Sequence, residues 1–154
     1  MTTSPSDSLE PLERLLAEKA CRDLVLAAAR AVDAQDYRAL AALFAPDGEL
    51  VRPGGEPLRG PQAVFDSYAA KDPHRLTQHL VTNHEVQVTS ATTARSCCRV
   101  ILWASRRDEA LTPRGRRADE AQQIGEIDDE FVRTPEGWRI ARRSARFTMF
   151  RDAG

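Results

Sequence analysis

Residues 77–89 combine side chains suited to acid–base chemistry with the pattern of a β-strand. The segment holds two of the three histidines of the chain, His79 and His84. Its polar and apolar residues alternate, which predicts a half-buried strand with His79, Val81 and Asn83 on one face. Because histidine readily exchanges a proton near neutral pH, a histidine and an asparagine on an inward face indicate a site.

The apolar phase of this strand changes after Asn83. Val86 and Val88 have the opposite parity to Val81, so we expect a β-bulge near His84. Bulges often redirect side chains beside functional sites. The Asn83 amide can then bind a substrate oxygen or satisfy the backbone of the bulge, and the sequence leaves both roles open.

A second candidate is Asp33, which ends a predicted helix. Leucine and alanine recur at helical spacing from Leu9 to Ala31, which predicts one long helix, continuous or broken near Cys21. A carboxylate at a helix C-terminus opposes the helix dipole and costs about 0.3–1 kcal/mol when exposed. We therefore expect a cationic or hydrogen-bonding partner for Asp33.

Two more helices and a series of strands are expected around these residues. Asp36 is suited to cap a helix at 37–44, and Gly60 with Pro61 to begin a third helix that ends near Ala70. Further strands are predicted at 49–52, 94–105, 122–134 and 137–150, with a tight turn at 134–137. Helices first and a meander of strands afterwards predict an α+β fold, in which the helices cover one face of a curved antiparallel sheet.

The length of 154 residues predicts a single domain over 1–154, large enough to enclose a pocket. Residues 1–7 are polar and contain a proline, which predicts a flexible N-terminus. Residues 106–121 are rich in Arg, Asp and Glu and contain Pro113 and Gly115, so we expect a mobile hairpin loop. Acidic residues are interleaved with its arginines and no aromatic residue accompanies them, which favours a solvated loop over a nucleic-acid surface.

The composition argues against several classes of partner. The 22 basic and 23 acidic residues nearly balance, so no overall attraction to nucleic acid or to an anionic membrane is expected. No apolar run approaches the roughly 20 residues that cross a bilayer, and the first residues lack the features of a signal peptide, so we expect a cytoplasmic protein. The three cysteines form no Cys-x-x-Cys pair and are expected to be reduced packing residues.

The histidines do not form a metal-binding motif. His74, His79 and His84 are spaced by five residues, but His79 and His84 have opposite strand parity, and no cysteine or regularly spaced carboxylate completes a ligand set. We therefore predict no metal and no cofactor. His74 and His84 are expected at the surface.

Four motifs match a known family in order and spacing. They are Ala-Val-Asp-Ala-Gln-Asp-Tyr-Arg-Ala-Leu-Ala-Ala-Leu-Phe-Ala-Pro-Asp-Gly at 31–48, Gly-Pro-Gln-Ala at 60–63, His-Leu-Val-Thr-Asn at 79–83 and Gly-Trp-Arg-Ile-Ala-Arg-Arg at 137–143. Over about residues 10–150 the chain resembles the SnoaL-like group of the nuclear transport factor 2-like superfamily, of the scytalone dehydratase and hexachlorocyclohexane dehydrochlorinase type. The resemblance implies a cone-shaped barrel, in which a curved sheet wraps three helices around one deep pocket.

The resemblance also implies roles for individual residues. Asp33 and His79 match an Asp–His pair that works in this pocket, with the Asp orienting a histidine base. Arg143 matches an arginine on the last strand. Ser96 falls near the second catalytic histidine of scytalone dehydratase.

These matches lead to a functional hypothesis. A carboxylate that accepts from one imidazole nitrogen fixes the tautomer and leaves the other nitrogen as a base. We predict a small cofactor-independent lyase that uses His79 and Asp33 for dehydration or a related β-elimination of a small hydrophobic, polyketide-like substrate. A cyclase or isomerase with the same pair is one alternative. A non-catalytic binding domain or accessory subunit is another, favoured by Ala28 and Ile127, which stand where many members carry tyrosine.

Strand parity and the family match predict the walls of the pocket. Six residues are expected to line it around the Asp–His pair: Leu50, Tyr68, Val81, Val100, Ile127 and Phe147. Asn83, Ser96, Asp129 and Arg143 are the predicted polar contacts to substrate. Asp129 and Arg143 lie on neighbouring strands and can form an ion pair instead, while an inward Arg143 can also stabilise developing negative charge.

The residues expected on the opposite face of the sheet predict that the protein associates with itself. Arg99, Ile101 and Trp103 share one face of the strand at 94–105. An exposed isoleucine and tryptophan form an apolar patch of the kind found at interfaces. We therefore predict a homodimer.

Overall fold

A computed structural model describes residues 9–152, so the terminus predicted at 1–7 lies outside the described residues. The helices are α1 (Pro11–Asp33), α2 (Tyr37–Ala42) and α3 (Pro61–Ala69). The strands are β1 (Phe44–Val51), β2 (Leu58–Arg59), β3 (Arg75–Val88), β4 (Thr93–Arg106), β5 (Gln122–Thr134) and β6 (Gly137–Arg151). The predicted strand at 49–52 thus begins earlier, at Phe44, which pairs with Ile140 of β6.

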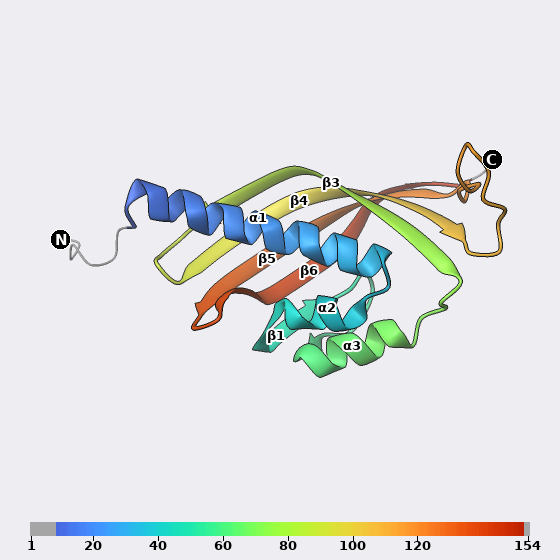
Figure 1. The fold of residues 1–154 in the computed structure, drawn as a ribbon. Helices are drawn as coiled ribbons and strands as arrows, with labels where there is room; N and C mark the ends of the chain where they lie inside the picture. Colours follow the sequence, from blue (N-terminus) through green and yellow to red (C-terminus); the bar gives the residue numbers. More distant parts are fainter. Residues whose placement is uncertain (1–8, 153–154) are drawn as a thin grey trace.

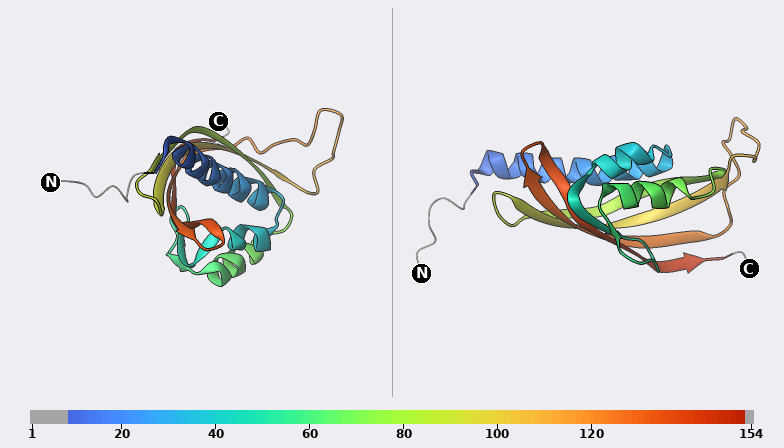
Figure 2. Two further views of the ribbon diagram at one scale, coloured as in Figure 1. Left: turned by 60° about the vertical axis from the view of Figure 1, so that its left-hand side comes forward. Right: turned by 90° about the horizontal axis from the view of Figure 1, so that it is seen from below.

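One six-stranded sheet has the order β2-β1-β6-β5-β4-β3. It is curved and open, and the three helices lie on its concave side (Figures 1 and 2). The predicted α+β fold with segregated helices is confirmed. Neighbouring strands are antiparallel except β1 and β6, which are parallel. No hairpin joins these two strands, so the connection does not impose an antiparallel direction.

The helix ends follow the local signals. Pro11 occupies the first position of α1, where its missing N–H is not needed. The helix ends at Asp33, and Gln35 then adopts a left-handed conformation with φ 58°. Asp36 caps α2 by accepting from the Ala39 N–H at 3.0 Å, as predicted. None of the described helices is both long and apolar enough to cross a membrane.

The core lies between α1 and the concave face of the sheet. Buried residues of α1 recur every three or four positions: Ala17, Cys21, Leu24, Val25, Ala28 and Ala31. Phe131 and Ile140 of the sheet belong to the same cluster, and burying a side chain of that size contributes about 1.5–3 kcal/mol. The alanines near the end of α1 are too small to fill the concavity there, which leaves space for a cavity.

The predicted bulge in β3 is present. The pairing of β3 with β4 shifts register between Thr82 and Glu85. Asn83 adopts a left-handed conformation with φ 49°, which asparagine tolerates better than most residues. The bulge therefore changes which side chains face inward along the strand.

Side chains of α1 and of the turn that follows it form hydrogen bonds with the backbone at the outer edge of β3. This edge is free because β3 is the last strand of the sheet. Three side-chain nitrogens donate to its carbonyl oxygens: Arg14 Nη1 to Val88 at 3.1 Å, Arg22 Nη1 to His84 at 2.9 Å and Gln35 Nε2 to Arg75 at 3.0 Å. These bonds fix α1 against β3 along its length.

The segment predicted as a hairpin loop at 106–121 connects β4 to β5. β4 ends at Arg106 and β5 begins at Gln122. The connection extends away from the helices at one end of the sheet (Figure 2). The turn predicted at 134–137 joins β5 to β6.

Candidate active site

Asp33 and His79 meet where the end of α1 crosses β3. His79 Nδ1 lies 2.5 Å from Asp33 Oδ1, and the His79 backbone N–H donates to Asp33 Oδ2 at 2.9 Å. Thr77 Oγ1 donates to Asp33 Oδ1 at 2.9 Å. These three contacts offset the unfavourable position of a carboxylate at a helix C-terminus. The predicted contact between Asp33 and His79 is present. It is made through Nδ1, so the other ring nitrogen, Nε2, is not used by Asp33.

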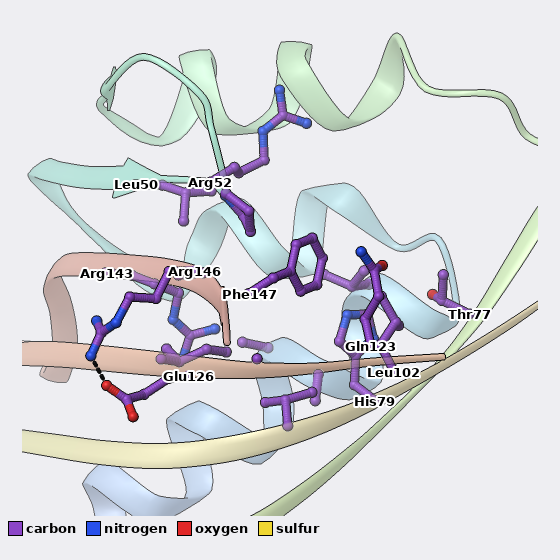
Figure 3. Close-up of a pocket in the computed structure, with 18 of the residues that line it drawn as sticks. Leu50, Arg52, Thr77, His79, Leu102, Gln123, Glu126, Arg143, Arg146 and Phe147 are labelled. Carbon is purple, nitrogen blue, oxygen red and sulfur yellow. Dashed lines mark ion pairs between the residues drawn. The ribbon is translucent and has the colours of Figure 1, made fainter. Parts of the chain in front are cut away.

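His79 lines a cavity of about 440 Å³ between the end of α1 and the concave sheet. This volume lies in the range of small-molecule sites. All six residues expected to line the pocket do so: Leu50, Tyr68, Val81, Val100, Ile127 and Phe147. Figure 3 shows His79 of β3 and Arg143 and Phe147 of β6 around the cavity.

Arg143 also lines the cavity, and Asp129 holds its guanidinium. Arg143 Nε donates to Asp129 Oδ1 at 2.7 Å, and Nη2 donates to Oδ2 at 2.8 Å. The side chains are only 9% and 0% exposed. Among residues 9–152 no acceptor engages Arg143 Nη1, so this nitrogen remains available as a donor. Asp129 itself does not line this cavity.

Two other predicted contacts do not line this cavity, Asn83 and Ser96. The bulge gives Asn83 a positive φ and leaves its side chain exposed. Ser96 is buried beside Asp129, its partner across β4 and β5. The cavity instead lies beside the C-terminal part of α1, where Val25, Ala28, Ala29 and Val32 form its wall. The prediction that Asn83, Ser96 and Asp129 contact a ligand is therefore wrong for this cavity.

His84 is half-buried rather than at the surface. The bulge turns its side chain inward, and within the described chain its buried Nε2 has no hydrogen-bond partner. Burial, and then the charge of Arg22, lower the pKa of His84. His74 is exposed, as expected.

Seven polar residues of the cavity wall were not predicted: Arg52, Lys71, Arg75, Thr77, Gln123, Glu126 and Arg146. Thr77 has the same strand parity as His79, so the sequence carried a signal for it. Gln123 lies at the start of β5. Arg52 and Lys71 lie outside helices and strands, where no periodicity indicates the direction of a side chain.

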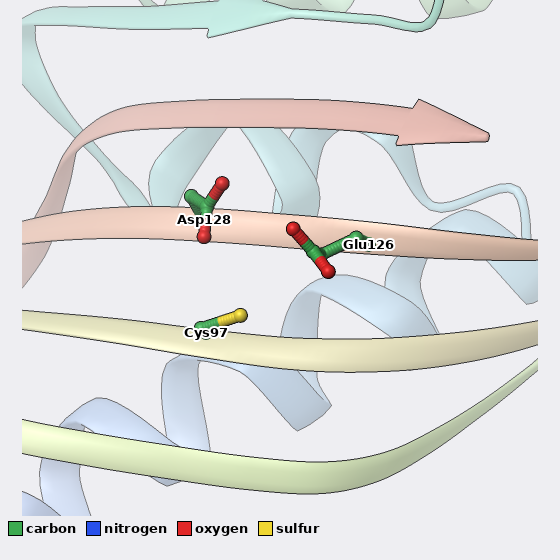
Figure 4. Close-up of side chains that lie close together, drawn as sticks. All are labelled: Cys97, Glu126 and Asp128. Carbon is green, nitrogen blue, oxygen red and sulfur yellow. The ribbon is translucent and has the colours of Figure 1, made fainter. Parts of the chain in front are cut away.

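A group of Cys97, Glu126 and Asp128 lies where β4 and β5 pair (Figure 4), and of these three Glu126 also lines the cavity. Their ligand atoms lie within 4.8 Å of one another. Glu126 already pairs with Arg99 and Arg146, and Asp128 with Arg146. Burial and the neighbouring Asp128 raise the pKa of Cys97, which disfavours a thiolate ligand. The group is best described as an ion-pair cluster.

The sequence profile of the SnoaL-like domain matches residues 13–144. No functionally curated protein matches the chain. The fold and the matched span agree with the resemblance drawn from the four sequence motifs.

Solved structures share the fold over nearly the whole chain. A candidate scytalone dehydratase from Novosphingobium aromaticivorans has 21% identity and a TM-score of 0.78, covering 94% of this chain and 93% of that one. A LinA-type hexachlorocyclohexane dehydrochlorinase from Novosphingobium barchaimii has 19% identity and a TM-score of 0.79, covering 94% and 95%. An NTF2-like protein with a cystatin-like fold from N. aromaticivorans has 22% identity and a TM-score of 0.71, covering 88% and 84%. These likenesses confirm the NTF2-like fold.

Proposed function

Because the chain belongs to the SnoaL-like family, we propose that it is a small cofactor-independent lyase in which His79 removes a proton from a bound substrate. The observation that carries this proposal is the fixed orientation of His79. Both oxygens of Asp33 contact this one residue, through Nδ1 at 2.5 Å and through the backbone N–H at 2.9 Å. A base held in this way needs no reorganisation before it reacts.

In the proposed reaction, His79 Nε2 takes a proton from a substrate carbon next to a leaving group. The electron pair of the broken C–H bond forms a C=C bond, and the leaving group departs with its own bonding pair. In a dehydration the imidazolium returns the proton to the departing hydroxide, which leaves as water. Asp33 stabilises the imidazolium between these two steps, and a base of this kind typically contributes about 10²- to 10⁴-fold.

Arg143 is suited to stabilise negative charge that develops during this reaction. Its Nε and Nη2 are engaged by Asp129, so the guanidinium is held in place while Nη1 can donate to an enolate or leaving-group oxygen. The apolar walls of the cavity strengthen such an interaction because they exclude water. They also favour a small hydrophobic substrate, and we propose a polyketide-like one.

Two alternatives use the same cavity. In a cyclase or isomerase the same pair would return the proton to another atom of the substrate or direct the carbanion to a new bond. In a non-catalytic binding domain the cavity would only hold a ligand. Ala28 and Ile127, both on the cavity wall, favour this last alternative because they provide no hydroxyl groups where many members carry tyrosine.

A screen of hydroxylated polycyclic compounds tests the proposal. The wild-type protein is compared with His79→Gln and Asp33→Asn, and turnover is followed by loss of water and by exchange of the substrate C–H proton in deuterated solvent. We expect both variants to remain folded and to lose at least about 10²-fold in both readouts. His74→Gln, which alters an exposed histidine, is the matched control.

The outcomes separate the alternatives. Proton exchange without loss of water indicates the isomerase or cyclase chemistry. Wild-type turnover by His79→Gln contradicts the assignment of the base. Tight binding by all variants without exchange or product supports the binding domain instead.

A further inference from the structure

The walls of the cavity carry an excess of positive charge. Five cationic side chains line it: Arg52, Lys71, Arg75, Arg143 and Arg146. Glu126 is the one Asp or Glu on the wall among the described residues. It already pairs with Arg146, as Figure 3 shows, and with Arg99. Arg143 is neutralised by Asp129. Arg75 pairs with Asp119. Among the described residues the uncompensated charge on the wall therefore lies on Arg52 and Lys71.

Arg52 and Lys71 both contact one aromatic ring of the cavity wall, at what we call the rim of the cavity. Lys71 Nζ lies 4.1 Å from the centroid of the Tyr68 ring, and Arg52 Cζ lies 5.4 Å from it. Both distances are in the range of cation–π contacts. Tyr68 comes from α3 and lines the cavity itself. The two cations are thus held beside the same wall of the cavity.

No carboxylate of the described chain forms an ion pair with Arg52 or Lys71. The acidic residue next in sequence, Asp72, pairs instead with Arg106 at 3.2 Å. Arg75 pairs with Asp119 at 3.3 Å. Partial burial of Lys71, and then the charges of Arg52 and Arg75, lower its pKa to about 8. Burial raises the pKa of Tyr68, so the phenol beside the two cations stays neutral and supplies no negative charge.

This arrangement is unfavourable by itself, because like charges repel and none of the described carboxylates offsets them. A bound anion at the rim would remove the repulsion and accept hydrogen bonds from both side chains. The apolar wall below, from Leu50, Val100 and Ile127, suits an uncharged body. Together the rim and the wall fit an amphipathic ligand with its charged end outward.

We propose that the cavity binds a substrate with an anionic group, a carboxylate, sulfate or phosphate, held between Arg52 and Lys71 while its apolar body extends toward His79. This inference deepens the proposed lyase function, on which the position of the body at His79 rests. The anionic group then acts as an anchor that sets which carbon lies near Nε2. Neutral hydrophobic molecules of the same shape would bind more weakly.

A pair of fluorescent probes that share one arene body tests the anchor directly. Anilinonaphthalene sulfonate carries an anionic group, and N-phenylnaphthylamine is its neutral counterpart. Affinities of both are measured for wild type, for Arg52→Gln with Lys71→Gln, and for the control Arg133→Gln, which removes one exposed cation from the β5–β6 hairpin. We expect the double variant to weaken sulfonate binding about tenfold or more and to change binding of the neutral probe less than about twofold.

Several outcomes decide the proposal. Equal weakening of both probes, or no change in either, overturns it. Sulfonate binding that weakens equally in Arg133→Gln also overturns it, because the effect would reflect net charge. The same titrations in His79→Gln separate this proposal from the catalytic one, since anion binding is expected to persist there. Displacement of the sulfonate probe by naphthoate or by naphthyl phosphate identifies the preferred anion.

Discussion

Replacing Asp129 by asparagine is expected to destabilise the protein by about 3 kcal/mol. Asp129 accepts two hydrogen bonds from Arg143, at 2.7 and 2.8 Å, and its side chain is fully buried. Removing one partner of a buried ion pair leaves an uncompensated charge and typically costs about 3–5 kcal/mol. Asparagine retains one acceptor oxygen, which favours the lower end of this range.

Urea unfolding followed by tryptophan fluorescence measures this loss. Trp138 is 9% exposed in the native protein, so its emission should report on unfolding of the core. The neighbouring variant Asp128→Asn is the matched control. Asp128 pairs with Arg146, and both side chains are about half exposed, at 48% and 51%, so its loss should cost less than about 1 kcal/mol.

The comparison of the two variants can refute the reasoning. If Asp129→Asn and Asp128→Asn shift the unfolding free energy equally, the buried pair does not carry the energy assigned to it. A double variant, Asp129→Leu with Arg143→Met, adds a second check. It removes both charges together and should be closer in stability to wild type than Asp129→Asn.

Three further predictions follow from the outer face, the thiols and the rim. Ile101 is 36% exposed on the outer sheet face, so Ile101→Asp should convert the proposed homodimer to a folded monomer; a monomeric wild type in light scattering at micromolar concentration would contradict the dimer. Burial raises the pKa of Cys21 to about 12 and that of Cys98 to about 11, so at about pH 8 both thiols should react with a disulfide reagent only after unfolding. Equal rates in native and urea-unfolded protein would count against this. Because Lys71, with its pKa of about 8, loses its proton as pH rises, sulfonate-probe affinity should fall through about pH 8 in wild type and stay level in Lys71→Arg; the same fall in both would exclude Lys71 as the cause.

Regular elements allowed much of the cavity wall to be predicted. Val81, Val100 and Ile127 were assigned to the wall from strand parity and the family match, and all three line it. Asp33 was singled out because its charge is unfavourable at a helix end, and its partners are now visible on β3. In both cases a local rule was sufficient, since side-chain direction in a helix or strand follows from sequence position.

The errors occur where that rule fails. The bulge in β3 was predicted, but not how it rotates its residues, so Asn83 was expected inside and His84 outside, whereas Asn83 is exposed and His84 is half-buried. Arg52 and Lys71 lie on irregular connections. Their positions beside Tyr68 depend on how α3 packs against the strands, a tertiary contact that no local pattern encodes.

The hydrogen bond from the His79 backbone to Asp33 has a consequence for self-association. β3 is a 14-residue edge strand, and the unpaired amides and carbonyls of such an edge are a template for adding a strand from another molecule. Asp33 occupies one of these amides, while Arg14 and Arg22 occupy two of the carbonyls. The carboxylate that orients the imidazole therefore also keeps the middle of the edge closed to intermolecular β-pairing. A variant that loses this carboxylate exposes a backbone donor at that point, and its soluble fraction after prolonged storage should decline before its secondary structure changes.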